Sequence, residues 1–172
     1  LAGGAVWGSV FGRYPLDSLK STVQVVACEF KRNLAISGAA VALASSSVGV
    51  IHDTIFTGNA ASDSGGAMHV SMMTSVTIED SGFTSNTAAD SGGAMAVTAQ
   101  ACVTILGARF ERNRASGLGG AALRVSAAQV ELFANAFSAN TADQGGGGVI
   151  LWDGSLKPIV RMACVHGWFA IA

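Results

Sequence analysis

One period runs through most of this 172-residue chain. A phenylalanine recurs first after 26 and then after every 27 residues, and an asparagine always follows it three positions later. The phenylalanines are Phe30, Phe56, Phe83, Phe110 and Phe137, and the asparagines are Asn33, Asn59, Asn86, Asn113 and Asn140. A glycine signature comes next in each copy, as Ser37-Gly38-Ala39, Gly65-Gly66-Ala67, Gly92-Gly93-Ala94, Gly119-Gly120-Ala121 and Gly146-Gly147-Gly148. A repeat that is kept this strictly indicates a solenoid, in which each copy packs on its neighbours.

The length and pattern of the repeat favour strands. Helical repeats need about 33–47 residues with long amphipathic segments, and no such segment is present here. Short apolar alternation broken by Gly, Asn and Ser is typical of strands, as in Val76-Thr77-Ile78. We therefore expect an all-β fold, a single-stranded parallel β-helix of about five coils with partial coils at both ends. Each coil would carry three short strands and three turns, and the coils would stack about 4.8 Å apart.

Stacking gives each marker a physical role. The phenylalanines should point inward as an aromatic stack, and the asparagines should form a hydrogen-bonded ladder at the following turn. The first glycine of each signature should adopt an unusual φ. The second, at Gly66, Gly93, Gly120 and Gly147, should allow the close approach that turns Met68, Met95 and Val149 inward. Residues 60–64, 87–91, 114–118 and 141–145 should be exposed polar loops.

Outside the markers, the chain divides into one regular part and two irregular ends. We expect a single β-helix segment over 1–172, with regular repeats over 23–154 and a sequence excerpted from a longer chain. Residues 1–22 read as a partial coil with an inserted loop. Residues 155–172 read as a degenerate last coil, because Cys164 and Gly167 stand where Phe and Asn are due.

Arg124 interrupts the pattern. The period places it with Val70, Val97 and Leu151 on the inward side, where an unpaired guanidinium would be costly. Either a local bulge turns Arg124 outward or the register of the repeat shifts at this point, and we favour the bulge.

The paired motifs resemble the repeats of the chlamydial polymorphic outer membrane proteins. The resemblance covers about residues 23–154, in copies such as Phe56-Thr-Gly-Asn59 with Gly65-Gly66-Ala67-Met68, and Phe83-Thr-Ser-Asn86 with Gly92-Gly93-Ala94-Met95. The first and last copies depart from it, with Ser37-Gly38 and Gly148 at the glycine signature. The resemblance implies a right-handed parallel β-helix and the surface-exposed passenger of an autotransported adhesin.

The charge balance, the hydropathy and the cysteines limit the kinds of partner and environment that the chain can have. Ten basic and eleven acidic residues give a net charge of −1, which argues against a nucleic-acid partner. The uncharged stretch 34–50 is short for a membrane span, and the repeat accounts for it, so this segment is expected not to span a membrane. Three widely spaced cysteines give no disulfide framework.

Two aspartate pairs are the candidate functional residues. Asp53 should stack on Asp80, and Asp63 on Asp90, each pair about 5 Å apart. Backbone capping in turns is the preferred interpretation, with weak cation binding and carboxylate catalysis as alternatives. His52, His69 and His166 fall in different columns, so we expect no metal and no other cofactor. Arg109, Arg112 and Arg114 read as a solvated face.

These observations favour a non-enzymatic structural or adhesive β-helix. It would be extracellular or at the cell surface, associated with the outer membrane, and would display loops and sheet faces to a protein or glycan partner. Two alternatives stay open: a carbohydrate-active β-helix such as a polysaccharide lyase or hydrolase, and a structural subunit whose open ends are covered by flanking coils or assembly subunits.

Overall fold

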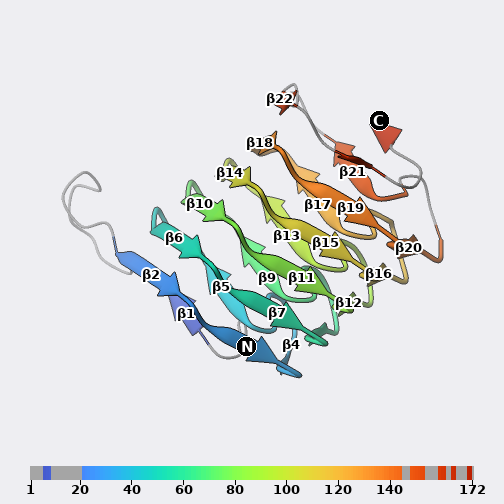
Figure 1. Ribbon diagram of the computed structural model, residues 1–172, viewed down its shortest axis with the longest axis horizontal. Helices are drawn as coiled ribbons and strands as arrows, with labels where there is room; N and C mark the ends of the chain where they lie inside the picture. The colour runs from blue at the N-terminus through green and yellow to red at the C-terminus, as the bar shows by residue number, and fades with distance from the viewer. Residues whose placement is uncertain are drawn as a thin grey trace.

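The strands of the chain stack into four parallel sheets that together form a right-handed β-solenoid of about five coils (Figure 1). A computed structural model describes residues 6–8, 21–144, 148–153, 159–161, 164–165 and 170–171, with side chains over 21–144 and 148–153. Figure 1 shows the coils side by side, from blue at one end to red at the other. The fold class expected from the repeat is confirmed.

Each sheet takes one strand from each successive coil. The first sheet contains β2 (Thr22–Val26), β6 (Val48–His52), β10 (Ser75–Glu79), β14 (Cys102–Leu106), β18 (Gln129–Phe133) and β22 (Ile159–Arg161). The second contains β3 (Glu29–Lys31), β7 (Ile55–Thr57), β11 (Gly82–Thr84), β15 (Arg109–Glu111), β19 (Ala136–Ser138) and β23 (Cys164–Val165). The third contains β4 (Leu34–Ala35), β8 (Ala60–Ala61), β12 (Thr87–Ala88), β16 (Arg114–Ala115) and β20 (Thr141–Ala142). The fourth contains β1 (Val6–Gly8), β5 (Val41–Leu43), β9 (Met68–Val70), β13 (Met95–Thr98), β17 (Leu123–Ser126), β21 (Ile150–Asp153) and β24 (Ala170–Ile171).

The third sheet corrects the expectation of three strands per coil. Its two-residue strands β8, β12, β16 and β20 lie in segments that were expected to be exposed loops. Ala61, Ala88 and Ala115 in these strands are buried. A methyl group is small enough to face the narrow interior at this corner, and an alanine surrounded by polar residues gives little strand signal.

The aromatic stack fills the interior beside the second sheet. Phe56, Phe83, Phe110 and Phe137 are completely buried, and Phe30 at the edge is half-buried. Successive rings are nearly parallel, with centroid separations of 5.2, 4.7, 4.8 and 4.8 Å. The inward phenylalanine column is confirmed.

The asparagine ladder is also confirmed. In each step the backbone N–H and the side-chain Nδ2 of one asparagine both donate to Oδ1 of the asparagine in the next coil, at 2.9–3.0 Å. Asn59, Asn86 and Asn113 are completely buried. Their polar groups are all paired, so burial carries no unsatisfied hydrogen bond.

The glycines act largely as predicted. Gly65 and Gly92, the first of their pairs, have φ of 66° and 64°. A Cβ on Gly66 would lie 2.0 Å from the carbonyl oxygen of Gly93, so the second glycine permits a close approach. In the next coil, however, Gly120 has φ of 65° and takes the place of Gly92 rather than that of Gly93. Gly147 lies outside the described residues.

A one-residue insertion explains this shift and corrects the prediction for Arg124. Gly117 bonds to Asp90, 27 residues earlier, but Gly119 bridges to Ser91, 28 residues earlier, so Leu118 is the extra residue. Arg124 consequently pairs with Ala96 and Leu151, and not with Val97. Arg124 therefore lies on the outward side of β17 because the register changes, which was the alternative to the favoured bulge.

The same shift moves two other predicted positions. Ile150 pairs with Leu123 in the column of Met68 and Met95, and Val149 is buried one position before it. Trp152, rather than Leu151, continues the inward column of Val70.

The ends agree with the expected partial coils where the structure describes them. Val6 pairs with Val41, and β22, β23 and β24 continue three of the sheets. Val165, and not Cys164, is in register with Phe137. The predicted inserted loop and most of the terminal cap lie outside the described residues.

Candidate functional site

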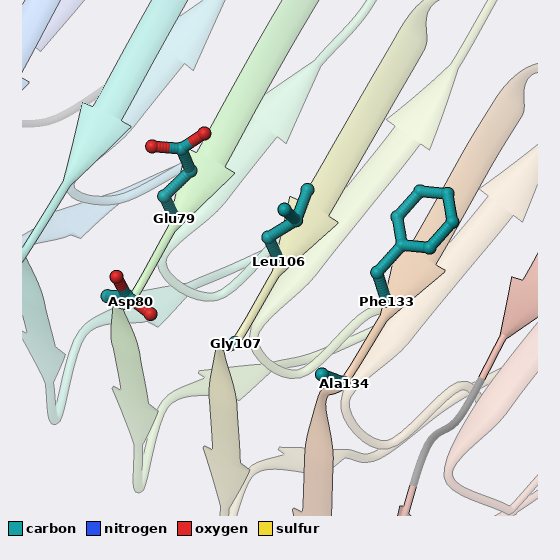
Figure 2. A pocket seen from close by; sticks show the side chains of 6 residues that line it. All are labelled: Glu79, Asp80, Leu106, Gly107, Phe133 and Ala134. Carbon is teal, nitrogen blue, oxygen red and sulfur yellow. The ribbon is translucent and has the colours of Figure 1, made fainter.

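An open groove of about 430 Å³ lies on the outside of the solenoid, where β10, β14 and β18 end. It spans three coils, and each coil contributes two consecutive residues. The lining residues are Glu79, Asp80, Leu106, Gly107, Phe133 and Ala134 (Figure 2).

Two neighbouring columns build this groove. The last residues of the first-sheet strands form the strand-end column, in which Glu79, Leu106 and Phe133 are in register. Figure 2 shows their side chains rising from adjacent strands on the same side. Side chains alternate along a strand. The buried Ile78 and Ile105 therefore place the next residues, Glu79 and Leu106, outside.

The corner column follows directly, where the chain turns from the first sheet to the second. Its members have left-handed backbone conformations: φ is 49° at Asp53, 46° at Asp80, 60° at Gly107 and 52° at Ala134. Aspartate and glycine tolerate this region better than most residues. The turn thus accounts for Asp53 and Asp80 at successive positions, as the repeat predicted.

Gly107 opens the floor of the groove. A Cβ at this position would lie 2.5 Å from Oδ1 of Asp80. The Asp80 carboxylate therefore occupies space that a side chain in the next coil would fill. Beyond it, only the methyl group of Ala134 rises from the floor.

The groove has an acidic half and an apolar half. Glu79 and Asp80 supply two carboxylates, while Leu106 and Phe133 supply an aliphatic and an aromatic wall. The Asp80 side chain is 71% exposed, and its Oδ2 lies 3.9 Å from Nε2 of His52 in the preceding coil. No lining residue carries a positive charge.

The second predicted aspartate pair lies elsewhere on the coil. The amide of Asp90 donates to the carbonyl of Asp63 at 2.9 Å, so the two residues are in successive coils as expected. Their carboxylates accept hydrogen bonds from serines, Asp63 from Ser37 at 3.0 Å and Asp90 from Ser91 at 3.1 Å. The Asp63 carboxylate is thus tied to the preceding coil, and the Asp90 carboxylate to the next residue in its own turn.

The histidines do not converge on a common site. His52 ends β6, whereas His69 lies in the fourth sheet, where its Nε2 is 3.2 Å from Oγ1 of Thr98. Burial lowers the pKa of His69, and the charge of Asp63 partly opposes this effect. His166 lies outside the described residues. Within the described part of the chain, no three His, Cys, Asp or Glu residues gather into a potential metal site.

The predicted basic face carries its own counter-ions. Nη1 of Arg112 lies 2.8 Å from Oε1 of Glu111, and Arg114 makes a bidentate pair with Asp143 at 2.6–2.9 Å. The hydrogen bonds from Arg114 hold the pKa of Asp143 below its usual value. Arg109 is exposed.

One polar column was not identified from the sequence. It lies two positions before each phenylalanine, at the corner, where all members but the exposed Cys28 are buried: Cys28, Thr54, Ser81, Ala108 and Asn135. Oγ of Ser81 accepts from the amide of Thr54, and Oδ1 of Asn135 accepts from the amide of Ala108 at 2.8 Å. The constant offset from phenylalanine was the available signal, but the residue type changes from coil to coil.

No protein-family model, curated protein or solved structure matches this chain. The resemblance to polymorphic outer membrane repeats therefore rests on the sequence motifs and stays a prediction. The described residues include no helix long and apolar enough to cross a membrane. The uncharged stretch 34–50 instead contributes to β4, β5 and β6.

Proposed function

We propose that this chain is a non-enzymatic adhesive or structural segment of an extracellular or cell-surface protein, and that it binds a partner on the lateral surface of the solenoid. The observation that carries the proposal is the position of the groove across three coils that are locked together. The stacked Phe83, Phe110 and Phe137 and the asparagine ladder fix these coils relative to one another. A site divided among locked coils is already organised before a partner arrives, which lowers the entropic cost of binding.

The distribution of ionisable groups also supports binding rather than cleavage. The groove carboxylates of Glu79 and Asp80 come from consecutive residues of one coil, and Figure 2 shows an apolar wall on the neighbouring strands. The other aspartate pair is hydrogen-bonded to Ser37 and Ser91. Glycoside hydrolysis typically uses two carboxyl groups that flank the scissile bond, and this arrangement is not found in the groove.

The first coil supports a second candidate, that of a structural subunit. β2, β3 and β4 are edge strands, and three large apolar residues near them are exposed: Val26 by 56%, Leu34 by 78% and Ile36 by 50%. Exposed apolar edges favour association. Sedimentation of the chain at increasing concentration tests this role, since a structural subunit should form larger species.

A glycan array and a cell-binding assay, with polysaccharide depolymerisation measured in the same wells, test the adhesive proposal. Saturable binding without depolymerisation is the expected result. Depolymerisation that is lost in the variant D63N/D90N or in E79Q/D80N would establish the carbohydrate-active alternative instead.

A further inference from the structure

We infer that the groove binds the basic side chain of a protein partner, with an apolar side chain of the same segment beside it; this inference rests on the proposed binding function. The ligand class is thus a cationic peptide segment in which a lysine or arginine stands near an aromatic or aliphatic residue.

Charge complementarity selects the cation. Glu79 and Asp80 place two carboxylates in the groove, and none of the six lining residues carries a positive charge. His52 approaches Asp80 only to 3.9 Å from the neighbouring coil, and the Asp80 side chain stays largely exposed. A guanidinium group can donate hydrogen bonds to both carboxylates, and it also gains from the attraction between opposite charges. A neutral sugar hydroxyl gains only the hydrogen bond.

The apolar half of the groove favours an apolar group of the ligand next to the cation. Leu106 is 38% exposed, and Phe133 stands beyond it on β18. Lysine and arginine bury their aliphatic stems along such surfaces, and aromatic rings attract the cationic group itself. An aromatic partner residue can pack on Phe133 at the far end of the groove.

The spacing of the coils sets the length of the segment. Glu79 and Phe133 are two coils apart, which corresponds to about 10 Å at the strand spacing of a sheet. In a polyproline II segment, residues three apart lie on the same side at about 9 Å, since the rise is about 3.1 Å per residue. A basic residue and an apolar residue three positions later therefore match the two halves of the groove.

The experiment titrates the full chain, labelled with nitrogen-15, with the peptide acetyl-Arg-Pro-Pro-Phe-amide. Binding is followed by NMR through the amide signals of Gly107 and Ala134. The matched probe replaces arginine by citrulline, which has nearly the same shape but no charge. We expect the arginine peptide to shift both signals, and we expect the citrulline peptide to bind roughly fivefold more weakly or worse. Added salt should reduce this difference.

Two double variants separate the groove from charge in general. E79Q/D80N removes the groove carboxylates, and asparagine is tolerated at the left-handed position 80. D63N/D90N removes the same charge from another column, and its amide oxygens can still accept from Ser37 and Ser91. Only E79Q/D80N should weaken binding of the arginine peptide, while both variants should keep the wild-type circular dichroism spectrum.

Equal binding of the two peptides, or equal losses in the two variants, would overturn the inference. So would shifts of the Gly107 signal caused by cello- or chito-oligosaccharides but not by the arginine peptide, which would assign the groove to sugars. The proposed function fails independently, because it requires saturable cell or glycan binding without depolymerisation. If E79Q/D80N keeps that binding at the wild-type level, the adhesive function stands and the groove is not its site.

Discussion

Asn59 donates two hydrogen bonds to one atom of Asn86: its backbone N–H and its Nδ2 reach Oδ1 of Asn86 at 3.0 and 2.9 Å. In turn, Nδ2 of Asn86 donates to Oδ1 of Asn113 and to the carbonyl of Phe56, both at 3.0 Å. One buried side chain therefore satisfies polar groups in the coils before and after it. This relationship makes the ladder sensitive to a single substitution.

Asn86→Ala should lower the free energy of unfolding by about 3 kcal/mol. The substitution leaves the buried backbone N–H of Asn59 without its acceptor, removes one of the two hydrogen bonds of Asn59 Nδ2, and removes the two that Nδ2 of Asn86 donates. A buried group left without a partner costs about 1–3 kcal/mol, and each lost hydrogen bond about 1 kcal/mol. Urea denaturation followed by circular dichroism measures the change.

Asn33→Ala is the matched control. Asn33 is half-buried at the end of the ladder, and no donor from the described residues reaches its Oδ1. Its replacement should cost about 1 kcal/mol or less, because Oδ1 of Asn59 keeps the hydrogen bond from the backbone of residue 33. Similar losses in the two variants would contradict a cooperative ladder.

Phe83→Ala should cost about 4 kcal/mol, the usual range for a large ring removed from a core. Phe83 is fully buried between Phe56 and Phe110, at centroid distances of 4.7 and 4.8 Å. Phe30→Ala should cost about half as much, since Phe30 is only partly buried and, among the described residues, stacks on Phe56 alone, at 5.2 Å. Thermal unfolding of both variants tests this order, and the reverse order would show that the edge coil is the more tightly held.

The stacked columns were predictable because their markers are identical and equally spaced. Phe56 and Phe83 differ by one period, so any parallel solenoid that buries one ring places the other on top of it. The register of Arg124 was not predictable in this way. The extra residue Leu118 is compensated in the following turn, so Phe110 and Phe137 keep their 27-residue spacing and hide the local shift.

The groove could be predicted only in part. The repeat aligned Asp53 with Asp80, but it did not predict that the Asp80 carboxylate would lie against Gly107 of the next coil. That arrangement depends on the missing side chain at Gly107 and on contacts between two adjacent columns. Identical residues mark a single column of the repeat, whereas this groove is made of different residues in two columns.

Gly49 and Leu43 compensate for each other in volume, and together they should be replaceable by two valines. Gly49 stands in the column of Val76, and Leu43 in that of Val70. A Cβ on Gly49 would lie 2.7 Å from Cδ1 of Leu43, so the longer leucine fills the space left by glycine.

Gly49→Val alone should therefore destabilise the fold by about 2 kcal/mol through overpacking. Leu43→Val alone should cost about 1 kcal/mol through a small cavity. The double variant reproduces the valine pair of the next coil and should recover at least about 1 kcal/mol of the summed loss. A double-mutant cycle from urea midpoints measures this coupling, and simple additivity would argue against the compensation.

The free energy of unfolding should decrease below neutral pH because of His69. Burial lowers its pKa in the folded state, whereas an unfolded histidine titrates near about 6.5. As the pH falls through that value, the unfolded chain binds a proton that the folded chain does not. Stability contributed by the neutral imidazole is therefore complete above about pH 6.5 and is lost as the pH falls towards the lowered folded pKa, by at most about 1.4 kcal/mol per pH unit.

His69→Gln isolates this effect, because the other titrating groups are common to both proteins and cancel in the comparison. Glutamine keeps a polar group that can reach Oγ1 of Thr98, the partner of Nε2 of His69. Between pH 7.5 and 5.5 the wild-type urea midpoint should fall more steeply than that of the variant. Parallel curves would mean that the imidazole takes up its proton in the folded state as readily as in the unfolded chain, which would contradict the burial of His69 as the cause of its lowered pKa.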